Sequence, residues 1–131
     1  MPQAISPFIL DRFEPEPPYQ EDPGVKYARA HIDKTFRGDI EAQSTVEMLS
    51  ASAEDGGAGY VALERVEGSV HGRPGTFALV HIGTMTGDGH WAKWPIVPGS
   101  GTGELAGISG EGRIEIDADG AHTLFLDYEL A

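Results

Sequence analysis

The most constraining feature of this chain is the regular recurrence of Gly-rich turn signals between Gly57 and Leu105. Short runs rich in Val, Ile, Tyr, Phe and Thr lie between these signals, with hardly any helical periodicity. Short strands separated by turns roughly every 8–12 residues are typical of an all-β sandwich or barrel. Closing the sheet into a barrel removes its exposed edges. We therefore predict an all-β, antiparallel, up-and-down β-barrel whose last strand pairs with its first.

Eight strands are predicted from Val25 onward, joined by connections whose Gly residues suit tight hairpins. The predicted strands are Val25–Phe36, Asp39–Ser50, Gly59–Val70, Gly75–Met85, Trp91–Val97, Gly103–Ser109, Arg113–Asp117 and Ala121–Leu130. The second of these has an alternative, because its sequence also permits a helix from Glu41 to Ala53. The alternation from Ile40 to Met48, together with the β-branched Thr45 and Val46, favours the strand.

The chain divides into a Pro-rich N-terminal arm, residues 1–23, and a single barrel domain, residues 24–131. Pro lacks the backbone amide donor, so the segment FEPEPPY fits neither a helix interior nor a central strand. The apolar side chains Phe8, Phe13 and Tyr19 make free disorder of the arm unfavourable. We expect the arm to be extended and to pack on the barrel or on a second subunit.

The composition limits the possible environments and partners. The 131 residues suffice for one domain with its own core, and the absence of Cys excludes disulfides and thiol chemistry while fitting a reducing cytoplasm. No apolar run reaches the ~20 residues of a membrane helix, and the first residues lack the pattern of a signal peptide. The formal net charge of -12 makes nucleic acid and anionic membranes poor partners. We therefore expect a cytoplasmic protein that binds neither.

Two neighbouring predicted strands are apolar on both faces, which indicates a partner outside the barrel. In Gly59–Val70, Val61 and Leu63 lie on the face opposite Tyr60, and Gly75–Met85 is also two-sided. A strand that is apolar on both faces is covered on both faces. One cover is the barrel interior, and the other is the N-terminal arm or a partner chain. We predict that the outer wall is buried in a homodimer or a higher homo-oligomer.

The main candidate for catalysis is a carboxylate–imidazole pair, Glu64 and His81, in the middle of these two strands. Burial raises the pKa of a carboxyl group, and a nearby imidazole shares or relays its proton. Such a pair suits general acid–base catalysis or the binding of a polar ligand group. The alternative is that Glu64 forms a structural ion pair with Arg29, Arg65 or another cation, and that His81 is an ordinary core or surface histidine.

Four further residues are candidates for ligand binding: Ser44, Tyr60 and Tyr128 through their hydroxyl groups, and Trp94 through its ring. The alternative for each is ordinary core packing with a satisfied polar atom. The histidines show no close ligand spacing, so we predict no metal site and no cofactor. The glycine-rich stretch Val97–Leu105 is interpreted as a rim loop or bulge, because a phosphate cradle opens a helix and has Lys or Arg at hand.

Several long segments closely resemble the DUF3224 family, a bacterial family of uncharacterised small proteins. The segments are KTFRGDIEAQSTVEML, GYVALERVEGSVHGRPGTFALVHIGTM, VPGSGTGELAGISGEGRIEI and LDYEL, and the resemblance covers about Tyr27 to Leu130. It implies an eight-stranded antiparallel barrel of the allene oxide cyclase-like type, related in shape to calycins, and it implies no activity. The N-terminal region departs from the family pattern, because it has Pro18–Tyr19 but no preceding Trp.

These observations lead to one predicted function and two alternatives. The prediction is a barrel that binds a small, largely apolar molecule in its interior, because eight-stranded barrels are just wide enough for one small ligand. The first alternative is a cyclase or isomerase that constrains an apolar substrate while Glu64 and His81 transfer protons. The second alternative is a filled barrel that acts as an interaction module through its outer wall.

Overall fold

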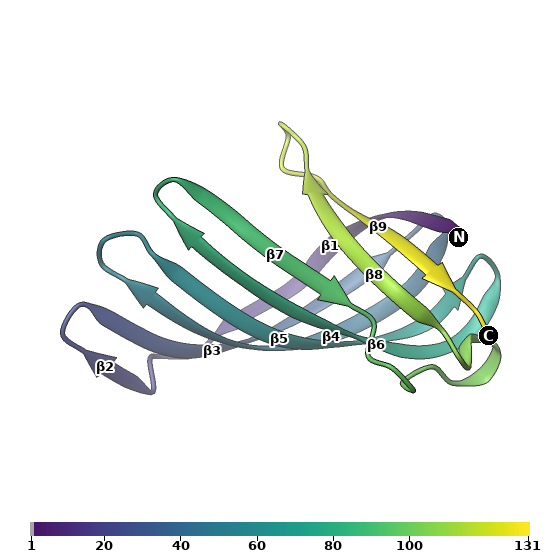
Figure 1. Cartoon of the computed structure of the whole chain (residues 1–131), viewed down its shortest axis with the longest axis horizontal. Helices are drawn as coiled ribbons and strands as arrows, with labels where there is room; N and C mark the ends of the chain where they lie inside the picture. Colours follow the sequence, from purple (N-terminus) through teal and green to yellow (C-terminus); the bar gives the residue numbers. More distant parts are fainter. Residues whose placement is uncertain (1) are drawn as a thin grey trace.

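The computed structural model describes residues 2–131 and folds this range into a nine-stranded antiparallel sheet with one 3-10 helix (Figure 1). The strands are β1 (Gln3–Pro15), β2 (Gln20–Asp22), β3 (Val25–Phe36), β4 (Ile40–Ala53), β5 (Ala58–Val70), β6 (Arg73–Thr86), β7 (Gly89–Pro95), β8 (Ser109–Ile116) and β9 (His122–Glu129). The 3-10 helix, η1, spans Gly103–Leu105. No helix in this range is long and apolar enough to span a membrane.

Strand β1 closes the sheet into a barrel because it pairs with two different strands. Its first half, up to Phe8, pairs with β9, and from Phe8 onward it pairs with β3, with a shift of register between Leu10 and Arg12. The order of the other strands is β9-β8-β7-β6-β5-β4-β3, and β2 lies beyond β3. Without β2, eight of the nine strands form the closed wall, so the predicted eight-stranded antiparallel barrel is confirmed.

The barrel has one closed end and one flared end. The turns β3–β4 and β5–β6 lie at the closed end, and the turns β4–β5, β6–β7 and β8–β9 lie at the flared end. Strands β7 and β8 pair only at Trp94–Gly112 and Pro95–Glu111. Toward the flared end they separate, and the β6–β7 and β8–β9 hairpins diverge (Figure 1). The wall is therefore split on this side of the opening.

The structure corrects the predicted identity of the first wall strand. The sequence pattern assigns this place to Val25–Phe36 and pairs the last strand against it, whereas β9 pairs with β1. Prolines in the first residues obscure an alternation that continues between them: Ala4, Ser6 and Phe8 face inward and are 0%, 0% and 5% exposed. The segment that follows Asp39 is strand β4, so the predicted strand is confirmed there and the helix alternative is wrong.

The predicted strand Gly103–Ser109 is wrong, because this segment forms η1 and a loop. Gly103 has a φ of 60°, and a Cβ at this position would lie 2.9 Å from the backbone oxygen of Pro74. The chain therefore turns sharply against the start of β6, where only Gly fits without strain. Leu105 and Ile108 are 1% and 2% exposed. Within residues 2–131, they pack at the closed end into the larger of two hydrophobic core clusters, which also contains Phe36, Ile40 and Phe77.

The core is tightly packed toward the closed end, whereas apolar side chains on the inner face of the flared end are exposed. Leu10, Phe13, Met85 and Ile116 are 42%, 53%, 43% and 63% exposed. They nevertheless belong to the inner face: Phe13, for example, lies directly opposite the buried Ile32. Leu10 lines a groove of about 400 Å³ together with Phe8, Ala121 and His122. Large exposed apolar patches mark binding sites.

Candidate functional site

Four polar side chains lie buried together on the inner faces of β3, β4, β5 and β6. The Glu64 carboxylate is at the centre and is 1% exposed. Its Oε1 accepts hydrogen bonds from Lys34 Nζ at 3.1 Å and from His81 Nε2 at 2.7 Å, and its Oε2 accepts one from Ser44 Oγ at 2.5 Å. We call these four residues the Glu64 cluster. The structure thus brings together three residues that were predicted from the sequence: Glu64, His81 and Ser44.

The antiparallel register explains why these side chains meet. Glu64 lies opposite Val46 on β4 and opposite Leu79 on β6. Ser44 is two positions from Val46, and His81 is two positions from Leu79, so both share the inward face of the sheet with Glu64. Such diagonal neighbours across a strand pair lie within reach of polar side chains of this length.

The cluster holds Glu64 in its ionised form. Burial raises the pKa of the Glu64 carboxyl, but the hydrogen bond from His81, the positive charge of Lys34 and the hydrogen bond from Ser44 outweigh burial and lower the pKa to about 2. An ionised carboxylate only accepts hydrogen bonds, so His81 donates through Nε2. A buried charge pair is tolerated when further hydrogen bonds satisfy its polar atoms, and His81 and Ser44 provide such bonds to the Glu64 carboxylate.

Lys34 is the member of the cluster that the sequence pattern did not single out. The sequence pattern that could have identified Lys34 is its place on the inward-facing side of β3, where the structure leaves it 6% exposed. The arginines considered as partners of Glu64 lie on the outer wall instead. Arg65 pairs with Glu67, and the Arg29 guanidinium lies 5.1 Å from the centre of the Tyr19 ring. The ion-pair alternative is therefore observed, with Lys34 as the cation.

Trp94 and Tyr60 border the Glu64 cluster on the inner face. The Trp94 and His81 rings meet edge to face, with centroids 5.7 Å apart. Trp94 is 9% exposed, and its buried Nε1 has no hydrogen-bond partner in the described part of the chain. Burial raises the pKa of the Tyr60 phenol, and hydrogen bonding from the nearby Trp94 N–H opposes this rise. The Tyr60 hydroxyl is therefore the neighbouring acceptor for the indole, although the two groups do not reach full hydrogen-bond geometry.

Gly83 leaves the space that the Tyr60 ring occupies. A Cβ at position 83 would lie 2.5 Å from Tyr60 Cε1 and 2.9 Å from the Tyr60 hydroxyl oxygen. We expect Gly83→Ala to displace this ring and to lower the free energy of unfolding by about 1–3 kcal/mol, as overpacking does. Urea denaturation measures the change. In a Tyr60→Ala background the same Gly83→Ala substitution should cost much less, and an equal cost in both backgrounds would contradict the steric explanation.

Tyr128 is the predicted site residue that the structure places elsewhere. Its hydroxyl is 2.5 Å from Nδ1 of His71, which lies in the β5–β6 turn at the closed end. Tyr128 is 4% exposed, and burial raises the pKa of its phenol. It packs in the larger core cluster and has no hydrogen bond to the Glu64 cluster within residues 2–131.

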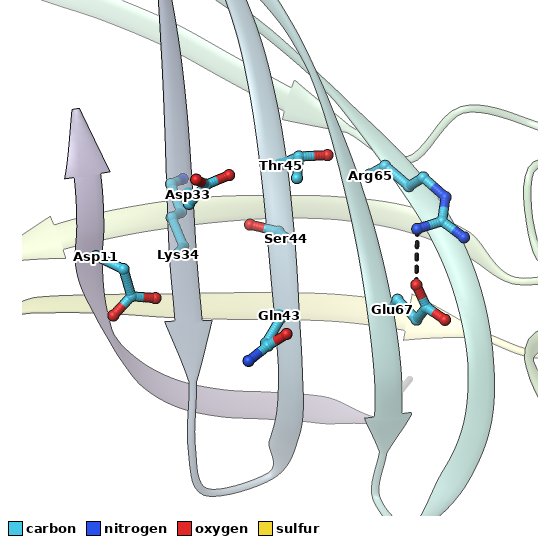
Figure 2. A pocket seen from close by; sticks show the side chains of 8 residues that line it. All are labelled: Asp11, Asp33, Lys34, Gln43, Ser44, Thr45, Arg65 and Glu67. Carbon is cyan, nitrogen blue, oxygen red and sulfur yellow. Dashed lines mark hydrogen bonds and ion pairs between the residues drawn. The ribbon is translucent and has the colours of Figure 1, made fainter. Parts of the chain in front are cut away.

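A polar groove of about 340 Å³ lies over the wall formed by β3, β4 and β5 (Figure 2). Its outward side chains carry both signs of charge, with Asp33 on one side and Arg65, paired to Glu67, on the other. No three His, Asp or Glu side chains among residues 2–131 are grouped closely enough to hold a metal ion. Lys34 and Ser44 of the Glu64 cluster also line this groove, and its other charged side chains, which include Asp11, are those of an ordinary solvated wall.

A second groove, of about 520 Å³, lies on the outer wall of β4, β5 and β6. Leu49, Val61 and Leu63 line it and are 44%, 49% and 59% exposed. The two covers predicted for this wall were the N-terminal arm and a partner chain. Strand β1 lies between β3 and β9 in the barrel wall and so does not cover the groove. A partner chain over this wall stays a prediction.

The chain has clear relatives among known proteins. Residues 4–128 match the family model described as a protein of unknown function, DUF3224. The chain is also similar to a crystal structure of a protein with unknown function from the DUF3224 family of Shewanella oneidensis MR-1, with 40% sequence identity and a TM-score of 0.92. This similarity covers 100% of this chain and 98% of the other. A comparison with curated proteins gives no match.

Proposed function

We propose that this chain, which belongs to the DUF3224 family of proteins of unknown function, binds a small, largely apolar molecule inside the flared end of its barrel. The exposed inner side chains of Phe13, Met85 and Ile116 support the location, because a bound molecule would remove them from water. An eight-stranded barrel is just wide enough to hold one small ligand. The tightly packed closed end forms the floor of this site.

The observation that carries the proposal is the unpartnered N–H of Trp94. Leaving a buried donor without a partner costs about 1–3 kcal/mol, and native structures contain few such groups. The Glu64 carboxylate already accepts hydrogen bonds from Lys34, His81 and Ser44, and the acceptor beside the indole is the Tyr60 hydroxyl. A ligand with a carbonyl or hydroxyl oxygen would give the indole N–H a well-aligned acceptor. The ligand that fits therefore has an apolar body and at least one acceptor oxygen.

Proton transfer by Glu64 and His81, as in a cyclase or isomerase, stays a prediction. With a pKa of about 2, the Glu64 carboxyl holds no proton to donate near neutral pH. General acid–base catalysis is most efficient when the pKa lies near the working pH. Binding is therefore the function we favour, with Glu64 orienting His81 behind the ligand.

A specific observation also favours self-association, through the apolar groove on the outer wall. This groove is lined by exposed Val61 and Leu63, and the N-terminal strand lies elsewhere. Arg29 and Glu47 both border the groove, so a two-fold axis through it would bring opposite charges of two copies together. We infer that a second copy of the chain covers this wall.

Native mass spectrometry of the purified protein tests both inferences. We expect a species that exceeds the mass of the bare chain by one small molecule, which is released when the protein is denatured. The same spectrum counts the subunits, and two copies are expected. A bare mass, combined with no detectable binding of apolar ketones by calorimetry, would refute the binding proposal. A monomer at high protein concentration would refute self-association and leave the binding proposal intact.

A further inference from the structure

A groove of about 400 Å³ lies where strand β1 leaves β9 and continues along β3. Phe8 marks the point of departure, because it is the last residue of β1 that pairs with β9 and the first that pairs with β3. From Ile9 onward, β1 has β3 on one side and no paired strand on the other among the described residues. The β8–β9 turn flanks this free edge, and its residues Gly120 and Ala121 line the groove.

The groove presents apolar surface to water on a rigid base. Ile9 and Leu10 line it and are 59% and 42% exposed. Phe8, also in the lining, is 5% exposed, and its ring lies 5.0 Å from that of Phe36 and 5.2 Å from that of His122, centre to centre. The volume is within the range of small-molecule sites. A ligand that covers Ile9 and Leu10 would gain free energy by removing them from water.

Arg37 is the only Lys, Arg, Asp or Glu residue in the lining of this groove, as far as residues 2–131 show. Its backbone is held firmly: its N–H donates to the carbonyl oxygen of Pro7 at 3.0 Å, and its carbonyl oxygen accepts the hydroxyl of the buried Ser6 at 2.6 Å. Its side chain is exposed and forms no ion pair in the described part of the chain. A guanidinium without a carboxylate partner is suited to bind one from a ligand.

Two carboxylates touch lining residues from outside the groove. Asp11 Oδ2 accepts a hydrogen bond from the Thr35 hydroxyl at 2.5 Å, and Asp117 Oδ1 accepts one from the N–H of Ala121 at 2.9 Å. Neither carboxylate belongs to the lining, whereas Arg37 does. The fixed charge in the groove itself is therefore positive, although the chain has 21 acidic and only 9 basic residues.

We propose that this groove binds a small apolar carboxylate, such as an aromatic acid. The apolar body lies on Ile9 and Leu10 against Ala121, and the carboxylate forms charge-assisted hydrogen bonds with the Arg37 guanidinium. A neutral or cationic molecule of the same shape makes the first contact without the second. The groove shares no lining residue with the Glu64 cluster and does not include Trp94, so this site is separate from the one proposed at the flared end.

Three matched naphthalene derivatives test the assignment, with calorimetry on the full-length protein as the readout. They carry a carboxylate, a carboxamide or a methylammonium group at the same ring position. We expect the carboxylate to bind about tenfold more tightly than the carboxamide, and the ammonium compound to bind most weakly. Trp94→Phe should leave the affinity for the carboxylate unchanged, because Trp94 does not line this groove.

A pair of arginine variants locates the charge that matters. Arg37→Gln removes the charge in the groove, and Arg73→Gln is the matched control, because Arg73 is also exposed, lies at the closed end and does not line the groove. Both substitutions remove one positive charge. We expect Arg37→Gln to weaken binding of the carboxylate about tenfold and to leave binding of the carboxamide unchanged. The control should change neither.

A second pair of variants locates the apolar part of the site. Ala121→Phe fills the groove from the β8–β9 turn, and Ala118→Phe places the same ring in the same turn outside the lining. Both positions are exposed, so neither substitution disturbs the core. We expect Ala121→Phe to abolish binding of the carboxylate and the carboxamide, and Ala118→Phe to leave both unchanged.

The outcomes separate this inference from the function proposed above. Equal binding of the carboxylate and the carboxamide, equal losses in the two arginine variants, or unchanged binding in Ala121→Phe would overturn the carboxylate site. Binding of none of the three compounds would overturn it as well. Loss of carboxylate binding in Trp94→Phe would assign the compound to the flared end, which overturns this inference and leaves the proposed binding function standing.

Discussion

Replacing Glu64 with Gln is expected to lower the free energy of unfolding by about 3–5 kcal/mol, the usual cost of removing one partner of a buried ion pair. The Gln oxygen can still accept the hydrogen bond from His81, and the Gln amide can donate to the Ser44 hydroxyl, so the loss arises mainly from Lys34. The Lys34 side chain is 6% exposed, and its ammonium group would keep its charge without a counter-ion. Urea denaturation measures the effect as a lower midpoint at an unchanged m-value.

A double variant distinguishes charge from packing in this prediction. Lys34→Met combined with Glu64→Gln removes both charges and keeps most of the volume. Replacing a buried pair with uncharged residues of similar size is often neutral or stabilising. We therefore expect the double variant to be more stable than Glu64→Gln alone and close to the wild type. Additive losses from the two single substitutions would contradict the ion pair as the source of the stability.

The same carboxylate makes stability depend on pH in a defined window. The pKa of Glu64 is lowered in the folded state from 4.5 to about 2, so its contribution is complete above pH 4.5 and is lost as the pH falls toward 2. The shift corresponds to about 3 kcal/mol. The difference in stability between the wild type and Glu64→Gln should therefore narrow by that amount over this window, and a constant difference would contradict a lowered pKa.

The sequence predicts the barrel better than it predicts which strands form it. The alternation in β4 and the Gly-marked hairpins are local signals, and these strands were correctly predicted. Two errors arose where local signals conflict with tertiary pairing. Pro7 lies within β1, although the prolines of this region led us to predict an extended arm. Leu105 is buried in the core from a loop, although the residues around it led us to predict a strand.

In the candidate site, too, local sequence patterns predicted some residues, and tertiary strand pairing decided the others. Period-two alternation was enough to place Glu64, His81 and Ser44 on inner faces, and the meander made their meeting predictable. It was not enough to choose the cation, because that choice depends on which strand lies next to β4 and at what register. Lys34 sits opposite Ser44 in the β3–β4 pairing, and only that register brings it to Glu64. Tyr128 also faces inward, but it lies apart from the Glu64 cluster, because the alternation alone does not show which end of the barrel a residue occupies.

The other large effect expected is on binding: Trp94→Phe should weaken the affinity for a naphthyl ketone about 10- to 100-fold. The substitution removes the only buried side-chain donor in residues 2–131 that has no partner, and a hydrogen bond in a buried site contributes about 1–3 kcal/mol. Trp91→Phe is the matched control, because Trp91 is 49% exposed and points away from the inner face. Calorimetry should detect no change in that variant.

A matched pair of probes separates the hydrogen bond from the lost ring area in Trp94→Phe. The second probe replaces the ketone oxygen with a methylene group, so it keeps the apolar body and lacks the acceptor. In the wild type the ketone should bind more tightly than the hydrocarbon, because only the ketone satisfies the indole N–H. In Trp94→Phe the two probes should bind equally, since the donor is gone. If the ketone kept its advantage in that variant, the Trp94 N–H would not be the group that recognises the ligand, and the proposed site would lose its central observation.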